Sequence, residues 1–293
     1  MAPPLLTTGA HGVSMVAMRT TQFSKGQGTG NDFVILLDRP GMLNLTPAHV
    51  KWLCDRRFGV GGDGLLRATR ASNIPEWDGR PDMWFMDFRN ADGSIAEMCG
   101  NGLRVFAEFL REEGLITGNE VDIATRVGVK HVLVHGDGTI TADLGRAAVS
   151  DEPVTVTLDG RSWQATPVDV GNPHAVVLLG ADDDLDELPV QTQPSWEPRS
   201  AFPDGVNIEF VEMIEPGHVR MRVHERGVGE TLSCGTGTVA VAAAMTAATG
   251  HHGPWTVDVP GGRIVVEESD DGFRLIGPAV IQIHGEVICP DLG

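Results

Sequence analysis

Short apolar runs that end in turn residues recur along this chain and predict β-strands. The first is 33–37, five apolar residues closed by the turn-forming stretch 38–41. Runs of the same kind occupy 83–88, 129–134, 139–144, 154–158, 175–179, 207–213 and 219–224, and an alternating strand pattern continues from 255 to 288. The pattern therefore predicts a fold rich in short strands.

Three other segments predict helices. Thr and Pro at the start of 46–57 suit the N-cap and first position of a helix that runs to about residue 57. A second helix follows Cys99–Gly102, with apolar residues at helical spacing up to Gly114. A third follows Cys234–Gly237 and is apolar on nearly all sides, so we expect it to be buried.

Two further patterns look like ligand sites, but their context argues against that. The glycine-rich stretch 59–64 predicts a tight loop, and it lacks the Gly-Lys-Ser/Thr of a phosphate-binding loop. His131 and His135 are four residues apart, yet the residues around them alternate as in a strand and offer no third ligand. We therefore expect histidines on a solvent-facing strand and no metal site.

The chain also contains an internal repeat. Three segments recur in the same order about 140 residues later. The matching pairs are Gly30-Asn31-Asp32 with Gly171-Asn172-Pro173, Asp63-Gly64 with Asp204-Gly205, and Cys99-Gly100-Asn101-Gly102 with Cys234-Gly235-Thr236-Gly237. We expect an α+β fold of two pseudo-symmetric domains with duplicated topology, which brings the two cysteine turns toward a shared cleft.

Composition narrows the class of protein. The 293 residues carry 22 Lys and Arg against 40 Asp and Glu, a formal net charge of −18, which argues against a nucleic-acid partner. No apolar run is long enough to cross a bilayer, so we expect no membrane association. Four cysteines without a C-x-x-C pair are too few for a disulfide framework and indicate the cytoplasm.

The first 18 residues have no organised pattern. They contain no Lys or Arg and are interrupted by Pro and Gly, which is unlike a secretory signal peptide. We interpret 1–18 as a loose N-terminal extension. Organised sequence begins at Arg19, so Met18 is a candidate translation start.

Cys99 and Cys234 are the candidate catalytic groups. Each is expected at the N-terminus of a helix, where free N–H groups and the helix dipole lower a thiol pKa from about 8.5 toward neutrality. Two such thiols on opposite sides of one carbon provide a base and an acid, which is a device for inverting a stereocentre. Cys54 and Cys289 have no such setting, and we expect them to be small buried apolar residues.

Five motifs in order make the chain resemble the diaminopimelate epimerase family. They are Gly30-Asn31-Asp32-Phe33; Asn90-Ala91-Asp92-Gly93-Ser94 leading to Cys99-Gly100-Asn101-Gly102; Gly171-Asn172-Pro173-His174; Asp204-Gly205-Val206-Asn207; and Glu225-Arg226-Gly227-Val228-Gly229-Glu230-Thr231 leading to Cys234-Gly235-Thr236-Gly237. The resemblance extends from about residue 20 to the end of the chain.

The resemblance implies an architecture. Each domain would be a curved, mostly antiparallel β-sheet or barrel around a central helix, with the active site in the cleft between them. The first domain would span 19–135 and the second 136–277, and we expect the segment 278–293 to return to the first. A homodimer is also implied.

The resemblance further implies a cofactor-independent isomerase that interconverts LL- and meso-2,6-diaminopimelate for lysine and peptidoglycan synthesis. Cys99 would remove the α-proton of the L-configured centre, and Cys234 would deliver a proton to the other face. His174 and Glu225 would assist the thiols. The residues that would bind substrate are Asn31, Asn90, Gly100, Asn101, Asn172, Asn207, Glu225, Arg226, Gly235 and Thr236.

One position departs from the family pattern. Many members carry Gln where this chain has Gly64, so a side-chain contact to the substrate is expected to be missing there. A pyridoxal enzyme would need a Schiff-base lysine, and none of Lys25, Lys51 and Lys130 has a phosphate-binding context. We therefore expect no cofactor.

Other interpretations stay open at this point. A proline or hydroxyproline racemase, or a phenazine-pathway isomerase, would share the fold. A thiol redox protein would join Cys99 and Cys234 in a disulfide, and a binding module would need neither thiol. Glu225 and Arg226 would then be an ordinary surface ion pair.

Overall fold

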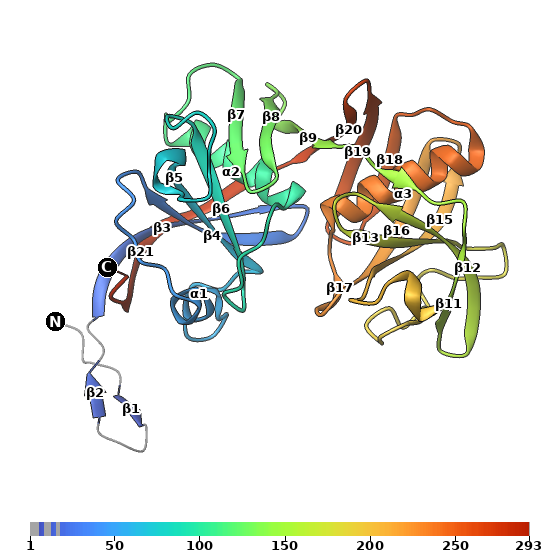
Figure 1. The fold of residues 1–293 in the computed structure, drawn as a ribbon, viewed down its shortest axis with the longest axis horizontal. Helices are drawn as coiled ribbons and strands as arrows, with labels where there is room; N and C mark the ends of the chain where they lie inside the picture. The colour runs from blue at the N-terminus through green and yellow to red at the C-terminus, as the bar shows by residue number, and fades with distance from the viewer. Residues whose placement is uncertain (1–5, 9–12, 16–17, 293) are drawn as a thin grey trace.

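The computed structural model describes residues 6–8, 13–15 and 18–292, and it shows two lobes lying side by side (Figure 1). The strands are β1 Leu6–Thr8, β2 Val13–Met15, β3 Met18–Gly28, β4 Asn31–Asp38, β5 Gly64–Arg70, β6 Trp84–Asn90, β7 Glu120–Thr125, β8 Gly128–Val134, β9 Thr139–Gly145, β10 Ala148–Val149, β11 Val154–Leu158, β12 Arg161–Asp169, β13 Pro173–Leu178, β14 Ser195–Glu197, β15 Asn207–Glu215, β16 His218–Glu225, β17 Gly229–Thr231, β18 Trp255–Val259, β19 Gly262–Ser269, β20 Gly272–Pro278 and β21 Val280–Pro290. The helices are α1 Pro47–Cys54, α2 Gly100–Glu112 and α3 Gly235–Thr249, with 3-10 turns η1 Ala71–Asn73 and η2 Arg199–Ala201. The expected strand-rich α+β fold is confirmed.

The two lobes repeat one strand arrangement. In the first, β4 runs parallel to β5, and β5 runs antiparallel to β6. In the second, β13 runs parallel to β15, and β15 runs antiparallel to β16. The duplication expected from the internal repeat is therefore present in the topology.

Each lobe encloses one long helix. Helix α2 packs on β3, β4, β8 and β9, and α3 packs on β12, β13, β15 and β19. The side chains from Leu103 to Leu110 are all buried, and so are those from Gly237 to Met245. Burial on almost every side explains why the pattern of α3 lacks a polar face. One apolar core cluster includes residues from both helices and so continues from lobe to lobe.

Two strand pairings tie the ends of the chain into this arrangement. Strand β9 pairs with β8 on one edge and with β20 on the other, which joins the two lobes. Strand β21 runs antiparallel to β3, from Val280 opposite Gln27 to Pro290 opposite Met18 (Figure 1). The last strand of the chain thus lies beside the first strand of the first lobe.

Several local features differ from the sequence-based expectation. Helix α1 ends at Cys54 instead of near residue 57, because the Asp55 carboxylate accepts hydrogen bonds from the backbone N–H groups of Arg57 and Phe58 and turns the chain. Strands β3, β5 and β12 were not predicted. Within the expected loose extension 1–18, β1 and β2 form a short antiparallel hairpin, and the other residues before Met18 lie outside the described part.

Among the described residues, no helix is long and apolar enough to span a membrane.

Candidate active site

Cys99 and Cys234 occupy equivalent positions at the N-termini of α2 and α3. Each is the N-cap residue of its helix and has an extended backbone conformation. The Cys99 sulfur accepts a hydrogen bond from the backbone N–H of Gly102 at 3.4 Å, and the Cys234 sulfur accepts one from Gly237 at the same distance. Each thiol therefore lies where free helical N–H groups would stabilise an anion.

The two helix N-termini meet at a pair of glycines. A Cβ added to Gly235 would lie 3.1 Å from the Gly100 Cα and 3.2 Å from the Asn101 backbone nitrogen. Only residues without side chains allow the two cysteine turns to approach this closely. The structure thus brings Cys99 and Cys234 to one place, at the junction of the lobes.

A buried polar cluster crosses that junction. The Asn101 side-chain amide donates to the Ser233 backbone oxygen at 3.1 Å and to its hydroxyl at 3.2 Å. The Ser233 hydroxyl also lies 2.9 Å from the Thr29 hydroxyl, which accepts from the Arg104 guanidinium at 3.2 Å. Sequence reasoning missed Thr29, Arg104 and Ser233, whose polar partners come from distant parts of the chain.

Burial has the largest effect on both thiols. It raises the pKa of Cys99 to about 11, aided by the negative charge of Glu225, and the Gly102 N–H opposes it only in part. Burial and the charges of Glu225 and Glu209 raise the pKa of Cys234 well above its ordinary value. The expected fall of the thiol pKa toward neutrality is wrong, because desolvation outweighs the helix N–H groups.

Glu225 lies within electrostatic range of both cysteines. It is the last residue of β16, and its carboxylate accepts a hydrogen bond from the Thr231 hydroxyl. Burial raises its pKa, and the charges of Glu209 and Asp63 act in the same direction. Its charge in turn raises the pKa of Cys99 and Cys234.

His174 forms a fully buried pair with Glu209. Its Nδ1 lies 2.7 Å from Glu209 Oε1, and its Nε2 lies 3.1 Å from Asn172 Oδ1. A Cβ on Gly237 would lie 2.7 Å from the same Glu209 oxygen and 3.3 Å from the Cys234 sulfur. Glu209 and Cys234 therefore both lie next to Gly237. Glu209 was missed because it looks like any glutamate in an alternating strand.

Asn31 is hydrogen-bonded to groups on three sides. Its Oδ1 lies 3.6 Å from the Cys99 sulfur and 3.4 Å from the Asn101 amide nitrogen. Its Nδ2 donates to the Asp63 carboxylate at 2.9 Å. Asn31 is therefore in direct contact with one candidate thiol.

The remaining candidate binding residues lie at the corresponding strand ends. Asn207 accepts from the backbone N–H of Arg226 at 2.9 Å and donates to the Pro173 oxygen. The Arg226 side chain is exposed, and among the described residues it has no carboxylate partner. Asn90 ends β6 and donates to the Ser94 hydroxyl, with no hydrogen bond to another candidate residue in the part described.

Gly64 has a structural reason to lack a side chain. It begins β5 opposite Asn90, and a Cβ there would lie 2.7 Å from the Phe88 ring and 2.8 Å from the Arg89 backbone oxygen. The packing of β6 therefore leaves no room for a side chain at this position.

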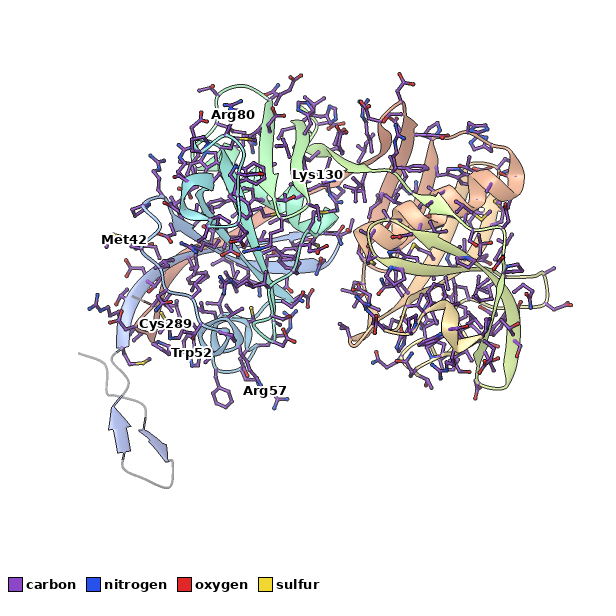
Figure 2. The ribbon with its side chains drawn as sticks, viewed as in Figure 1. Met42, Trp52, Arg57, Arg80, Lys130 and Cys289 are labelled. Atoms are coloured by element: carbon purple, nitrogen blue, oxygen red, sulfur yellow. The ribbon has the colours of Figure 1, made fainter. Side chains whose placement is uncertain are left out.

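The other two cysteines belong to a different apolar cluster from Cys99 and Cys234. Cys54 and Cys289 are buried in one apolar cluster, on which Trp52 packs, as expected for small apolar residues (Figure 2).

His131 lies on strand β8 and His135 directly follows it. The His131 side chain contacts Asp122, and the His135 side chain contacts Thr141.

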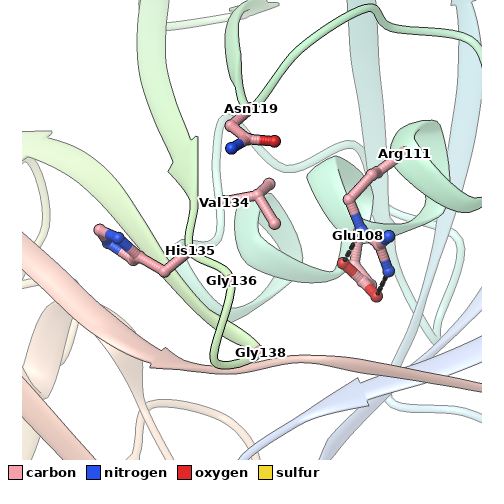
Figure 3. A pocket seen from close by; sticks show the side chains of 7 residues that line it. All are labelled: Glu108, Arg111, Asn119, Val134, His135, Gly136 and Gly138. Atoms are coloured by element: carbon pink, nitrogen blue, oxygen red, sulfur yellow. Dashed lines mark hydrogen bonds and ion pairs between the residues drawn. The ribbon is translucent and has the colours of Figure 1, made fainter.

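A cavity of about 220 Å³ lies near the C-terminal end of α2 (Figure 3). Its lining includes His135 and the Glu108–Arg111 ion pair. Glu108 is nine residues beyond Cys99, or about 14 Å along the helix. This cavity is therefore separate from the cysteine pair.

Solved structures identify the class of fold. The chain aligns with a phenazine biosynthesis protein of the PhzF family from Bacillus anthracis at a TM-score of 0.64 and 16% identity, covering 92% of this chain and 99% of that one. It aligns with a hydroxyproline epimerase from Agrobacterium vitis at a TM-score of 0.61 and 15% identity, covering 94% and 95%. The chain therefore shares the fold of the PhzF-family protein and of the hydroxyproline epimerase.

Sequence comparison identifies the family within that class. A model of the family Diaminopimelate epimerase matches residues 23–149 and 166–282. A diaminopimelate epimerase from Streptomyces coelicolor is 50% identical over 274 residues, covering 90% of this chain and 94% of that protein. One from Corynebacterium glutamicum is 45% identical over 275 residues, covering 92% and 98%. The chain belongs to the diaminopimelate epimerase family and is an isomerase.

Proposed function

We propose that the chain interconverts LL- and meso-2,6-diaminopimelate with Cys99 and Cys234 as its two acid/base groups, supplying lysine and peptidoglycan synthesis. One sulfur, as thiolate, removes the α-proton from one face of the reacting carbon. The other, as thiol, donates a proton to the opposite face, so the configuration inverts. The single observation that carries the proposal is the convergence of two equivalent cysteine N-caps at the Gly100–Gly235 contact.

The backbone around each cysteine supports the same chemistry. Removal of an α-proton leaves negative charge on the carbon and carboxylate, which preorganised N–H donors stabilise in a water-poor site. The first turns of α2 and α3 offer such donors at Gly100, Asn101, Gly235 and Thr236. The substrate α-carboxylate would bind there.

The thiols need groups that adjust their protonation. Glu225 acts electrostatically on both sulfurs, and the buried His174–Glu209 pair lies on the Cys234 side. We propose that the Glu225 carboxylate accepts the proton of one thiol when substrate binds, so that its charge no longer opposes the thiolate, and that His174 assists on the Cys234 side. Water leaves the site at that step, and the bound ammonium offsets the carboxylate charges.

The distal, non-reacting centre of the substrate would be held by polar groups at the strand ends. The exposed Arg226 guanidinium suits a carboxylate, which it grips in a bidentate manner. Asn31, Asn90, Asn172 and Asn207 offer amide donors and acceptors for the distal ammonium and carboxylate. Recognition of both ends would separate diaminopimelate from a short substrate such as proline.

Proton NMR of LL-diaminopimelate with reduced enzyme in D2O tests the function. We expect loss of the α-proton signal together with appearance of the meso form. The matched control is proline under the same conditions, which should show no exchange. Exchange of proline with no exchange of diaminopimelate would overturn the substrate assignment in favour of a proline-type racemase.

We also propose that the enzyme is a cytoplasmic homodimer. All four cysteines are free, as in a reducing compartment. Among the described strands, β21 pairs only with β3, and it carries exposed Val280, Ile283 and Ile288, which a second copy would cover. Sedimentation that gives only a 31.3 kDa species would contradict the dimer.

A further inference from the structure

The orientation of the Asn31 carboxamide is fixed from two sides. Its Nδ2 donates to Asp63, whose carboxylate oxygens accept hydrogen bonds and do not donate them. Its Oδ1 accepts from Asn101 Nδ2, and that nitrogen is identified by its bond to the Ser233 backbone oxygen, which also only accepts. A flipped Asn31 would place oxygen against oxygen at Asp63 and nitrogen against nitrogen at Asn101.

This orientation decides which atom faces the thiol. The Asn31 Oδ1 is 3.6 Å from the Cys99 sulfur. A thiol S–H can donate a hydrogen bond to that oxygen. A thiolate cannot donate, and its negative charge would be repelled by the lone pairs of the oxygen. The carboxamide therefore favours the protonated form of Cys99.

Asp63 is itself held by two further hydrogen bonds. It accepts from Arg56 at 2.8 Å and from the Asp32 backbone N–H at 3.2 Å. Arg56 also bonds both oxygens of Asp32, which Lys25 contacts at 3.0 Å. The network holds the Asp63 carboxylate next to Asn31, although the Asp63 side chain is 46% exposed.

We propose that Asp63 is a positioning residue that holds the Asn31 oxygen against Cys99 and so retains the proton on this thiol in the ligand-free enzyme. The inference rests on the proposed role of Cys99 as an acid/base group and adds a residue that acts on it through Asn31. Before Cys99 can serve as the base, its proton must leave and the Asn31 contact must change. Asp63 thus opposes ionisation of Cys99 until substrate enters.

The other charged groups that act on Cys99 are the same in both test variants. Arg104 of α2 favours the thiolate, and Glu225 at the end of β16 opposes it. Neither is hydrogen-bonded to Asp63. The charge of Asp63 also raises the pKa of Glu225. A change at Asp63 therefore reaches Cys99 through Asn31 or through the loss of its charge, which acts directly or by way of Glu225. Both substitutions remove the charge and only one removes the acceptor, so they separate the carboxamide route from the charge route.

The experiment compares Asp63→Leu with Asp63→Asn in the full chain, without substrate. The alkylation rate of each cysteine by iodoacetamide is followed against pH by peptide mass spectrometry. The quantity compared is the midpoint pH of each curve of alkylation rate against pH. Access of the reagent to a cysteine changes the maximal rate at high pH and leaves this midpoint unchanged. Cys234 is the internal reference, and circular dichroism checks the fold.

We expect Asp63→Leu to lower the Cys99 midpoint by about one pH unit, a tenfold rise in thiolate below the midpoint, because Asn31 can then turn its NH2 toward the sulfur. Asp63→Asn keeps an accepting oxygen, so its midpoint should stay close to that of the unmodified enzyme. The Cys234 midpoint should stay constant in both variants. If Asp63→Leu is poorly folded, Asp63→Ala also removes the acceptor.

Two results would overturn the proposal. An unchanged Cys99 midpoint in the folded variant without the acceptor would show that Asp63 does not act on the thiol. Equal shifts in Asp63→Asn and Asp63→Leu would show that charge acts, and not the orientation of Asn31. Both results leave the epimerase assignment intact, because that assignment is decided by the NMR exchange experiment.

Discussion

The side-chain amide of Asn101 donates to both the backbone oxygen and the hydroxyl of Ser233, at 3.1 and 3.2 Å. Asn101 lies two residues after Cys99, and Ser233 directly precedes Cys234. The backbone segments that carry the two thiols are therefore hydrogen-bonded to each other across the lobe junction. The separation of the sulfurs depends on this contact.

Ser233→Ala removes the hydroxyl that bonds Asn101 and Thr29 but keeps the backbone oxygen. We expect a stability loss of about 1 kcal/mol and a kcat lowered several-fold with little change in KM, because the thiols lose their spacing and the substrate contacts remain. Steady-state kinetics and urea unfolding measure the two effects. Ser195→Ala, at an exposed position, is the control and should change neither. A rise in KM alone would contradict the spacing role.

Cys99→Ala and Cys234→Ala should each abolish epimerisation while the protein stays folded. Each removes one of the two groups required to take and return a proton. Proton NMR in D2O and circular dichroism check activity and fold. Cys54→Ala is the matched control, and it should lose about 1–2 kcal/mol of stability through its buried position and retain activity. Normal turnover of either single variant would disprove the two-base mechanism.

The pH dependence of activity follows from the raised thiol pKa values. Cys99 has a pKa of about 11 in the ligand-free form, so the thiolate fraction rises with pH throughout the neutral range. We expect kcat/KM to rise close to tenfold per unit between about pH 7 and 9. A flat profile there would mean that a thiol is already ionised before substrate binds.

The raised pKa of Cys99 also makes the free energy of unfolding fall as pH rises, whereas activity is expected to increase. The folded state holds the Cys99 proton to higher pH than the unfolded state does. Its contribution to stability is complete below about pH 8.5 and is lost as pH rises toward 11. Urea unfolding should therefore show stability falling across this window, and less so for Cys99→Ala.

Asp32 should contribute to stability in acid. Burial opposes its ionisation, but the hydrogen bonds and charges of Arg56 and Lys25 outweigh burial and lower its pKa to about 2. The contribution, about 2 kcal/mol, is present above about pH 5 and lost as pH falls toward 2. Asp32→Asn should thus destabilise the protein at pH 7 and by only about half as much at pH 3. An equal loss at both pH values in urea unfolding would show that charge is not the cause.

Gly64→Ala should destabilise the protein by about 1–3 kcal/mol, because the new Cβ overlaps the Phe88 ring and the Arg89 oxygen. Gly136→Ala is the matched control, since no atom lies within 4 Å of its added Cβ. Thermal unfolding compares the two. If Gly64→Ala were as stable as the control, β6 would have to shift at little cost in free energy. Packing would then not explain why position 64 is a glycine.

The sequence predicted the duplicated strand-rich fold and the two cysteine helix starts, because both leave local patterns. Apolar runs mark strands 33–37 and 207–213, and a glycine turn followed by helical spacing marks Cys99 and Cys234. These signals are short-range and do not need the tertiary structure.

The features that were missed depend on long-range pairing. Strand β3 is mostly polar and becomes a strand because β4 and β21 lie on either side of it. Thr29 and Ser233 are 204 residues apart, and nothing near either one indicates that their hydroxyls meet. Burial of the thiols likewise depends on both lobes, so their pKa shifts could not be read from the helix positions alone.

The pairing of β21 with β3 affects how the protein is made. A ribosome releases Met18–Gly28 long before it releases the partner strand Val280–Pro290. The second lobe can complete most of its own strand pairs first, while the first lobe still lacks β21. Loss of β21 should therefore damage the lobe that was synthesised first.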